Sequence, residues 1–129
     1  MAKLTLIRGL PGSGKTTMAL AMVEVDHMLE HLEADQYFVD ASGNYKFEPS
    51  EVEDAHQWCQ NLAEFHISRG TSVVVANTFT RKWEMAPYLK IAKEHGAELE
   101  ILEAKGNYES IHGVPKETIE RMRSRWEEV

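Results

Sequence analysis

Residues 9–16 constrain the fold more than any other stretch of the chain. They read GLPGSGKT and match the pattern G-x-x-x-x-G-K-[ST] at every defined position. A short β-type run, residues 3–8, precedes this loop, and helix-forming residues 17–23 follow it. In this strand–loop–helix context the glycines let successive backbone amides turn toward one anion, and the helix directs its N-terminal N–H groups at the same point. The loop therefore predicts a site for the phosphates of a nucleoside triphosphate.

Individual residues of this loop have distinct expected roles. Lys15 can reach the β- and γ-phosphates, and the Thr16 hydroxyl can ligate Mg²⁺. We therefore expect ATP or another nucleoside triphosphate, together with Mg²⁺, as cofactors. The predicted nucleotide-binding residues are Gly9, Pro11, Gly12, Ser13, Gly14, Lys15, Thr16 and Thr17.

Hydrophobic periodicity and turn residues predict an alternation of strands and helices along the chain. After the first strand we expect a helix from about Lys15 to Val25, a weak strand over 31–34 ending at Asp35, and a long helix opened by a capping box at 50–53. A strand over 71–77, a helix over 81–95 and a strand over 97–103 follow. A final helix has Pro115 in its first turn. Such alternation is typical of a parallel sheet with helices on both faces. We predict an α/β P-loop NTPase fold in a single compact domain, residues 1–129.

Charge and apolar content limit the class of protein. The chain has 14 basic and 21 acidic residues, a formal net charge of −7, which argues against a broad nucleic-acid-coating surface but leaves a local basic groove open. No apolar run approaches membrane-spanning length. We therefore expect a cytoplasmic protein with no membrane partner, and the oligomeric state stays open.

The cysteine and histidine residues give little sign of a disulfide or a zinc site. Cys59 is the only cysteine, which excludes an intramolecular disulfide and favours a small buried apolar residue in a reducing compartment. His27 to His31 spell H-x-x-E-H, but that pattern needs a continuous helix, whereas here a helix ends and a strand begins. We expect two partly exposed histidines there.

The remaining candidate residues follow from the rule that ligands of an open parallel sheet lie beyond the carboxyl ends of its strands. That edge receives Asp35, Asn77, Thr78 and Glu103. Asp35 is either the group that accepts the proton of an attacking hydroxyl or a turn-capping aspartate. The third strand ends without a carboxylate for the metal, and Asn77 can orient a metal-bound water instead.

A lid over the site is expected at about residues 105–113, an irregular stretch with two glycines. Lids in phosphoryl transfer bring cations onto the transferring group, yet this one carries Lys105 and His112 and no arginine. Arg81 lies elsewhere near the same end of the domain and can substitute, although a solvated helix face is the plainer interpretation of such a charge.

Six segments, LIRGLPGSGKTT, EADQYF, GNYKFEP, AHQWCQ, ANTFTRKWEMAPY and HGVP, occur in this order. Together they resemble the compact polynucleotide-kinase-like P-loop kinases over nearly the whole chain. The resemblance implies ATP-dependent phosphoryl transfer to the 5′-hydroxyl of DNA or RNA. It also implies that Lys15 and Thr16 hold the triphosphate and Mg²⁺ and that Asp35 is the general base.

The chain departs from this family mainly on the acceptor side. The family commonly has an arginine in the lid shortly before HGVP, and an aspartate where this chain has Ala76. Phe38 stands where a substrate-holding arginine is found, and Phe38 or Phe79 can stack on a base instead. The candidate acceptor and lid residues are Phe38, Thr78, Arg81, Lys105 and His112.

Three functions remain open from the sequence. The first is a polynucleotide 5′-hydroxyl kinase that uses ATP and Mg²⁺. The second is a kinase with a nucleoside, sugar or other small-molecule acceptor, which the acidic balance and the missing arginines favour. The third is a nucleotide-binding regulatory module with little transferase activity.

Overall fold

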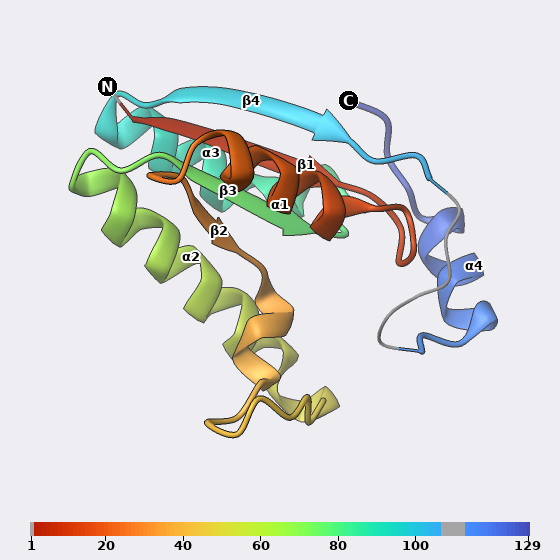
Figure 1. Cartoon of the computed structure of the whole chain (residues 1–129). Coiled ribbons are helices and arrows are strands. Elements are labelled where there is room, and N and C mark those ends of the chain that lie inside the picture. Colours follow the sequence, from red (N-terminus) through yellow and green to blue (C-terminus); the bar gives the residue numbers. More distant parts are fainter. Residues whose placement is uncertain (1, 107–112) are drawn as a thin grey trace.

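A parallel β-sheet forms the centre of the protein in a computed structural model, which describes residues 2–106 and 113–129. Across these residues the strands are β1 (Lys3–Arg8), β2 (Glu30–Leu32), β3 (Val73–Asn77) and β4 (Glu98–Glu103). They pair in the order β2-β3-β1-β4 (Figure 1). All three pairings are parallel, so the carboxyl ends of the strands meet at one edge.

The two central strands explain why the sheet is covered on both faces. Leu6 of β1 is paired with Val75 of β3, and both belong to the larger apolar core. The next pair along, Ile7 and Ala76, belongs to a smaller core on the opposite face. The uninterrupted β-branched run of β3 therefore supplies apolar side chains to both cores.

Four helices surround this sheet within the described residues. The smaller core packs against α1 (Lys15–Val25), while α2 (Val52–Ser68) and α3 (Lys82–His95) pack against the larger one. Figure 1 shows α4 (Lys116–Ser124) near the carboxyl ends of the strands. The predicted α/β fold with helices on both faces is confirmed. No described helix has the length and apolarity needed to span a membrane.

Several predicted boundaries differ from the structure, and three of the differences have a local cause. β2 ends at Leu32, and Asp35 lies in the 3-10 helix η1 (Ala34–Phe38), because the backbone N–H of Ala34 bonds the Asn77 side chain and the chain turns there. The capping box at 50–53 is absent, because the 3-10 helix η2 (Pro49–Glu51) precedes α2 and is capped by Glu48. Pro115 caps α4 instead of occupying its first turn.

The C-terminal tail is fastened to the sheet by Arg8, which is 1% exposed. Its guanidinium donates to the backbone carbonyl of Phe79 at 2.8 Å and to that of Glu127 at 2.6 Å, and it lies 4.0 Å from the ring centre of Trp126. A buried arginine needs such partners because its charge cannot be left unpaired. These contacts hold the segment after α4 against the end of β1.

Candidate functional site

The phosphate loop has the backbone that its sequence requires. Gly12 and Gly14 have φ values of 81° and 95°, in the left-handed region that favours glycine, and α1 begins at Lys15. The amide of Gly9 donates to the carbonyl of Thr78 at 3.2 Å, and the amide of Gly106 donates to the carbonyl of Ser13 at 2.9 Å. The loop is thus tied to the segments that follow β3 and β4.

Lys15 is held across this loop. Its Nζ donates to the carbonyl oxygen of Leu10 at 3.1 Å. Burial lowers the pKa of Lys15 from its ordinary value, and the carboxylates of Glu33 and Asp35 partly offset that effect. The ammonium of Lys15 is suited to bind an anionic group such as a phosphate. The two carboxylates near it, Glu33 and Asp35, suit a phosphate group that is bound together with a metal ion.

A cavity of about 520 Å³ opens from the loop. Its walls come from the loop, the β2–η1 turn, the end of β3, the start of α2, aromatic residues 45 and 47, and residues 113–122. Among the sequence-predicted residues it is lined by Pro11, Gly12, Gly14, Lys15, Thr16, Thr17, Asp35, Phe38, Asn77 and Thr78. The structure therefore gathers the loop and the candidate base around one space.

Four of the predicted nucleotide, acceptor and lid residues that the structure describes are not part of this lining. Gly9 and Ser13 are buried, and a Cβ on Gly9 would stand 2.9 Å from the carbonyl oxygen of Ala104 as well as against Ser13 Oγ. Arg81 lies at the start of α3, 3.9 Å from a carboxylate oxygen of Glu127, and Lys105 is exposed. His112 and most of the expected lid, residues 107–112, lie outside the described residues.

Asp35 is hydrogen-bonded to a tyrosine that also lines the cavity. The hydroxyl of Tyr45 donates to Asp35 Oδ1 at 3.3 Å. Burial, together with the charge of Asp35 and this hydrogen bond, raises the pKa of Tyr45 to about 12. Tyr45 therefore stays a neutral donor to the carboxylate at physiological pH.

Asn77 fixes the turn that carries Asp35. Its Oδ1 accepts from the amide of Ala34 at 2.9 Å, and its Nδ2 lies 3.9 Å from the sulfur of Cys59. Asn77 as a whole is 7% exposed, so these contacts are shielded from water. Its predicted contact with a metal-bound water stays a prediction. Cys59 is fully buried, and burial raises the pKa of its thiol.

The aromatic residues near the site are arranged differently from the sequence-based interpretation. Phe38 and Phe79 are only 7% and 3% exposed, so neither offers an open ring face. Phe47 is 51% exposed and lines the cavity, with Tyr45 stacked beside it at 6.4 Å between ring centres. Both belong to the segment GNYKFEP, which carried the family resemblance but pointed to no individual role.

Glu33 is a further residue that sequence reasoning missed. It lies between β2 and η1, is 9% exposed and lines the cavity. Its Oε2 accepts from Thr16 Oγ1 at 2.8 Å and lies 2.7 Å from His31 Nε2. This pairing explains the second histidine of the H-x-x-E-H stretch as a partner of a carboxylate.

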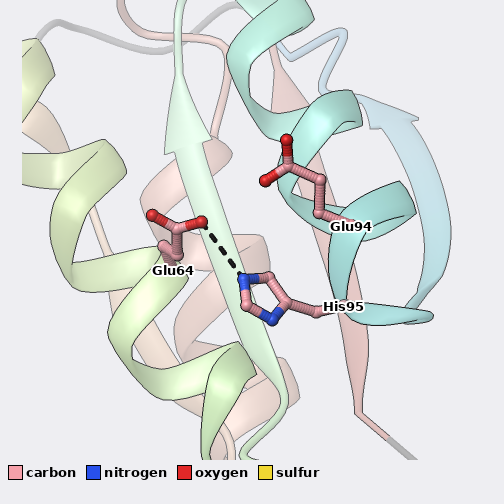
Figure 2. A group of neighbouring side chains, drawn as sticks. All are labelled: Glu64, Glu94 and His95. Carbon is pink, nitrogen blue, oxygen red and sulfur yellow. Dashed lines mark hydrogen bonds and ion pairs between the residues drawn. The ribbon is translucent and has the colours of Figure 1, made fainter.

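A second group of acidic and histidine side chains lies away from the cavity. His95 of α3 is 3.1 Å from Glu64 of α2, and Glu94 stands close to both (Figure 2). None of the three lines the cavity, and the group is open to solvent. We interpret it as a hydrogen-bonded contact between two helices.

These features define a class of protein before any comparison is made. A parallel sheet whose first strand leads into a G-x-x-x-x-G-K-[ST] loop and a helix is a P-loop nucleotide-binding domain. A family model described as an AAA domain matches residues 4–129. The chain belongs to this family, and its resemblance to the polynucleotide-kinase-like P-loop kinases is confirmed.

Individual relatives agree with this assignment. Human NEDD4-binding protein 2 is 34% identical over 129 residues, covering 92% of this chain and 7% of the relative. A chain of the Pnkp1/Rnl/Hen1 RNA repair complex superposes with a TM-score of 0.74 at 17% identity, covering 96% of this chain and 43% of that one. Kti12 of Chaetomium thermophilum, in complex with ADP-AlF3, has a TM-score of 0.72 at 18% identity, covering 97% and 80%. The chain thus spans less than half of the first two.

Proposed function

We propose that this protein is a kinase that transfers the γ-phosphate of ATP to the 5′-hydroxyl of a polynucleotide end. The observation that carries the proposal is the shared cavity, because Lys15, Thr16 and Asp35 all line it. Phosphoryl transfer needs little more than positioned charges and a group that accepts the hydroxyl proton, and these three residues supply both.

Each of the three residues has a definite role in this proposal. The ammonium of Lys15 binds the β- and γ-phosphates and stabilises the charge that develops on the transferring group. The carboxylate of Asp35 accepts the proton of the attacking hydroxyl and orients that hydroxyl for in-line attack. Tyr45 donates to Asp35 Oδ1 and so holds the carboxylate in place.

The residues beside Lys15 fit a magnesium ion. Mg²⁺ prefers oxygen ligands and keeps several waters, so one or two protein groups plus phosphate oxygens are enough. The hydroxyl of Thr16 lines the cavity and is one such oxygen ligand. The ion, when bound, neutralises charge on the phosphates.

The aromatic part of the cavity lining suits a base-bearing acceptor. Phe47 is half exposed within the cavity, and an aromatic face binds bases of any sequence by stacking. The likeness to a chain of an RNA repair complex agrees with a nucleic-acid end as acceptor. Labelling of DNA and RNA oligonucleotides at equal concentration measures which of the two is preferred.

One observation favours a second candidate, a kinase with a small acceptor. Among the described residues that line the cavity, Lys15 and His56 are the basic ones, and the whole chain carries a net charge of −7. A polynucleotide brings several phosphates that such a wall neutralises poorly. A nucleoside or sugar has no such requirement.

An acceptor comparison separates the two candidates. Labelled γ-phosphate is supplied as Mg²⁺–ATP to 5′-hydroxyl DNA and RNA oligonucleotides, nucleosides and sugars at equal concentration. We expect labelling of oligonucleotides, and we expect Phe47→Ala to weaken their binding by about 1–3 kcal/mol, roughly 5- to 150-fold in KM. Phe65→Ala, at a similarly exposed phenylalanine on α2, is the matched control. Labelling of nucleosides or sugars alone would overturn the polynucleotide assignment.

A further inference from the structure

Glu33 occupies a position beside the phosphate loop that no feature of the phosphate-loop motif accounts for. Its Oε2 is held from two sides, by Thr16 Oγ1 at 2.8 Å and by His31 Nε2 at 2.7 Å. The side chain lines the cavity. Its negative charge partly offsets the lowering of the Lys15 pKa by burial. A nearly buried carboxylate at this point has to have compensating partners, because desolvating an anion is costly.

The contact with Thr16 directs that hydroxyl. A hydroxyl has one proton to donate and lone pairs with which to accept or ligate. Because the Thr16 hydroxyl donates its hydrogen bond to Glu33, the lone pairs of Thr16 Oγ1 are left to ligate a cation. A carboxylate acceptor also strengthens this hydrogen bond relative to a neutral one.

The end of β3 does not provide a carboxylate of its own. Ala76 has no polar side chain, and Oδ1 of Asn77 is engaged by the amide of Ala34 at 2.9 Å. Among the described residues that line the cavity, the carboxylates are Glu33 and Asp35, and Asp35 is the one bonded by Tyr45. Glu33 is therefore the carboxylate in contact with the predicted metal-ligating hydroxyl.

We propose that Glu33, from the end of β2, supplies the carboxylate of the Mg²⁺ site that the end of β3 lacks. It is a positioning residue that orients the Thr16 hydroxyl and offers its second oxygen, Oε1, to the shell of the ion. No hydrogen bond engages Oε1 among the described residues, and His31 keeps the carboxylate from rotating away. This assignment rests on the proposed use of Mg²⁺–nucleotide by the same site.

The test measures ADP binding with Mg²⁺ and with EDTA, for the wild type and Glu33→Gln, and counts Mn²⁺ bound to the ADP complex by electron paramagnetic resonance. Glutamine keeps the length of the side chain and an oxygen that accepts from Thr16. We expect the affinity for Mn²⁺ and the Mg²⁺-dependent part of ADP binding to fall about 10- to 100-fold, as for other groups that orient metal ligands. Binding in EDTA is expected to be unchanged or tighter, because a negative charge beside the phosphates is gone.

Two further variants sharpen the result. Glu33→Asp retains a carboxylate and is expected to recover part of the metal affinity. Glu30→Gln removes an exposed carboxylate at the start of β2, outside the cavity lining, and is expected to bind ADP like the wild type under both conditions.

Three outcomes would overturn the assignment. If Glu33→Gln shows the Mg²⁺ dependence of the wild type, Glu33 has no part in the metal site, while the proposed kinase function stands. If ADP binding falls equally with Mg²⁺ and with EDTA, Glu33 only tethers β2 to the loop. If the wild type itself binds ADP without any Mg²⁺ dependence and its ADP complex binds no Mn²⁺, this assignment fails, while the transfer assay decides the proposed function separately.

Discussion

Asp35 and Tyr45 form the residue pair on which the proposed proton transfer depends. The tyrosine hydroxyl donates to Asp35 Oδ1 at 3.3 Å, which fixes the carboxylate without protonating it. Because the pKa of Tyr45 is raised to about 12, the donor remains neutral over the whole range in which a kinase works. The tyrosine hydroxyl therefore remains a donor to this carboxylate at neutral pH.

Removing the charge of Asp35 changes the titration of Tyr45. In Asp35→Asn we expect the pKa of Tyr45 to fall from about 12 toward its ordinary value of 10 but to stay above it, since burial is the larger cause of the shift. Tyrosinate absorbance in the near ultraviolet, read as the difference between each protein and its Tyr45→Phe counterpart, isolates this residue. An unchanged Tyr45 titration in Asp35→Asn would contradict the contact.

The same shift has a defined effect on stability. The folded chain keeps the Tyr45 proton more tightly than the unfolded chain, so the stabilisation is complete below pH 10 and lost between pH 10 and about pH 12. The difference in unfolding free energy between the wild type and Tyr45→Phe should shrink over that window.

The sequence-based predictions agree with the structure for residues whose role depends on neighbouring positions in the chain. They fail for residues whose role depends on contacts between distant segments. The phosphate loop was predictable because its pattern dictates its own backbone. Glu33 was not, because its contact with Thr16 spans 17 positions and appears only once β2 lies beside β3 and the loop. Phe47 was missed for the same reason, whereas Phe38 and Phe79 looked available until their burial was known.

At the scale of elements, the turn from β2 into η1 is the piece that decides where Asp35 lies. The sequence-based prediction extended the strand to Asp35, but β2 pairs with β3 only over Glu30–Leu32. Beyond Leu32 the chain bends, and the hydrogen bond from the amide of Ala34 to Asn77 fixes the bend. Hydrophobic periodicity alone cannot locate the end of β2, because the side chain that accepts from the Ala34 amide belongs to Asn77, 43 positions further along the chain.

This turn can be loosened without touching Asp35. Asn77→Ala leaves the buried amide of Ala34 without its acceptor, and we expect a loss of about 1–3 kcal/mol in unfolding free energy measured in urea. Hydrogen exchange at the Ala34 amide should lose its protection. Asn61→Ala, on the exposed surface of α2, should change stability by less than about 0.5 kcal/mol. Undiminished protection at Ala34 would show that the turn does not depend on Asn77.

At the scale of the whole molecule, the fold brings six separated stretches of the described residues to one cavity. Parallel pairing sends the carboxyl ends of β1, β2 and β3 to the same edge, and the contact of Arg8 with Trp126 and Glu127 fastens the tail beyond α4. The alternation of elements was enough to predict the parallel sheet and its two covered faces. It did not predict that residues 113–122 would form part of the cavity wall.

The claim that unites these scales is that Lys15 and Asp35 face one reacting phosphate and its acceptor. The most direct test is single-turnover transfer of labelled γ-phosphate from Mg²⁺–ATP to a 5′-hydroxyl oligonucleotide, with ATP binding measured in parallel. The wild type should transfer, Asp35→Asn should bind ATP normally and transfer about 10²- to 10⁴-fold more slowly, and Lys15→Met should lose ATP binding. Transfer by Asp35→Asn at the wild-type rate, or a wild type that binds ATP and labels no oligonucleotide, would contradict this account.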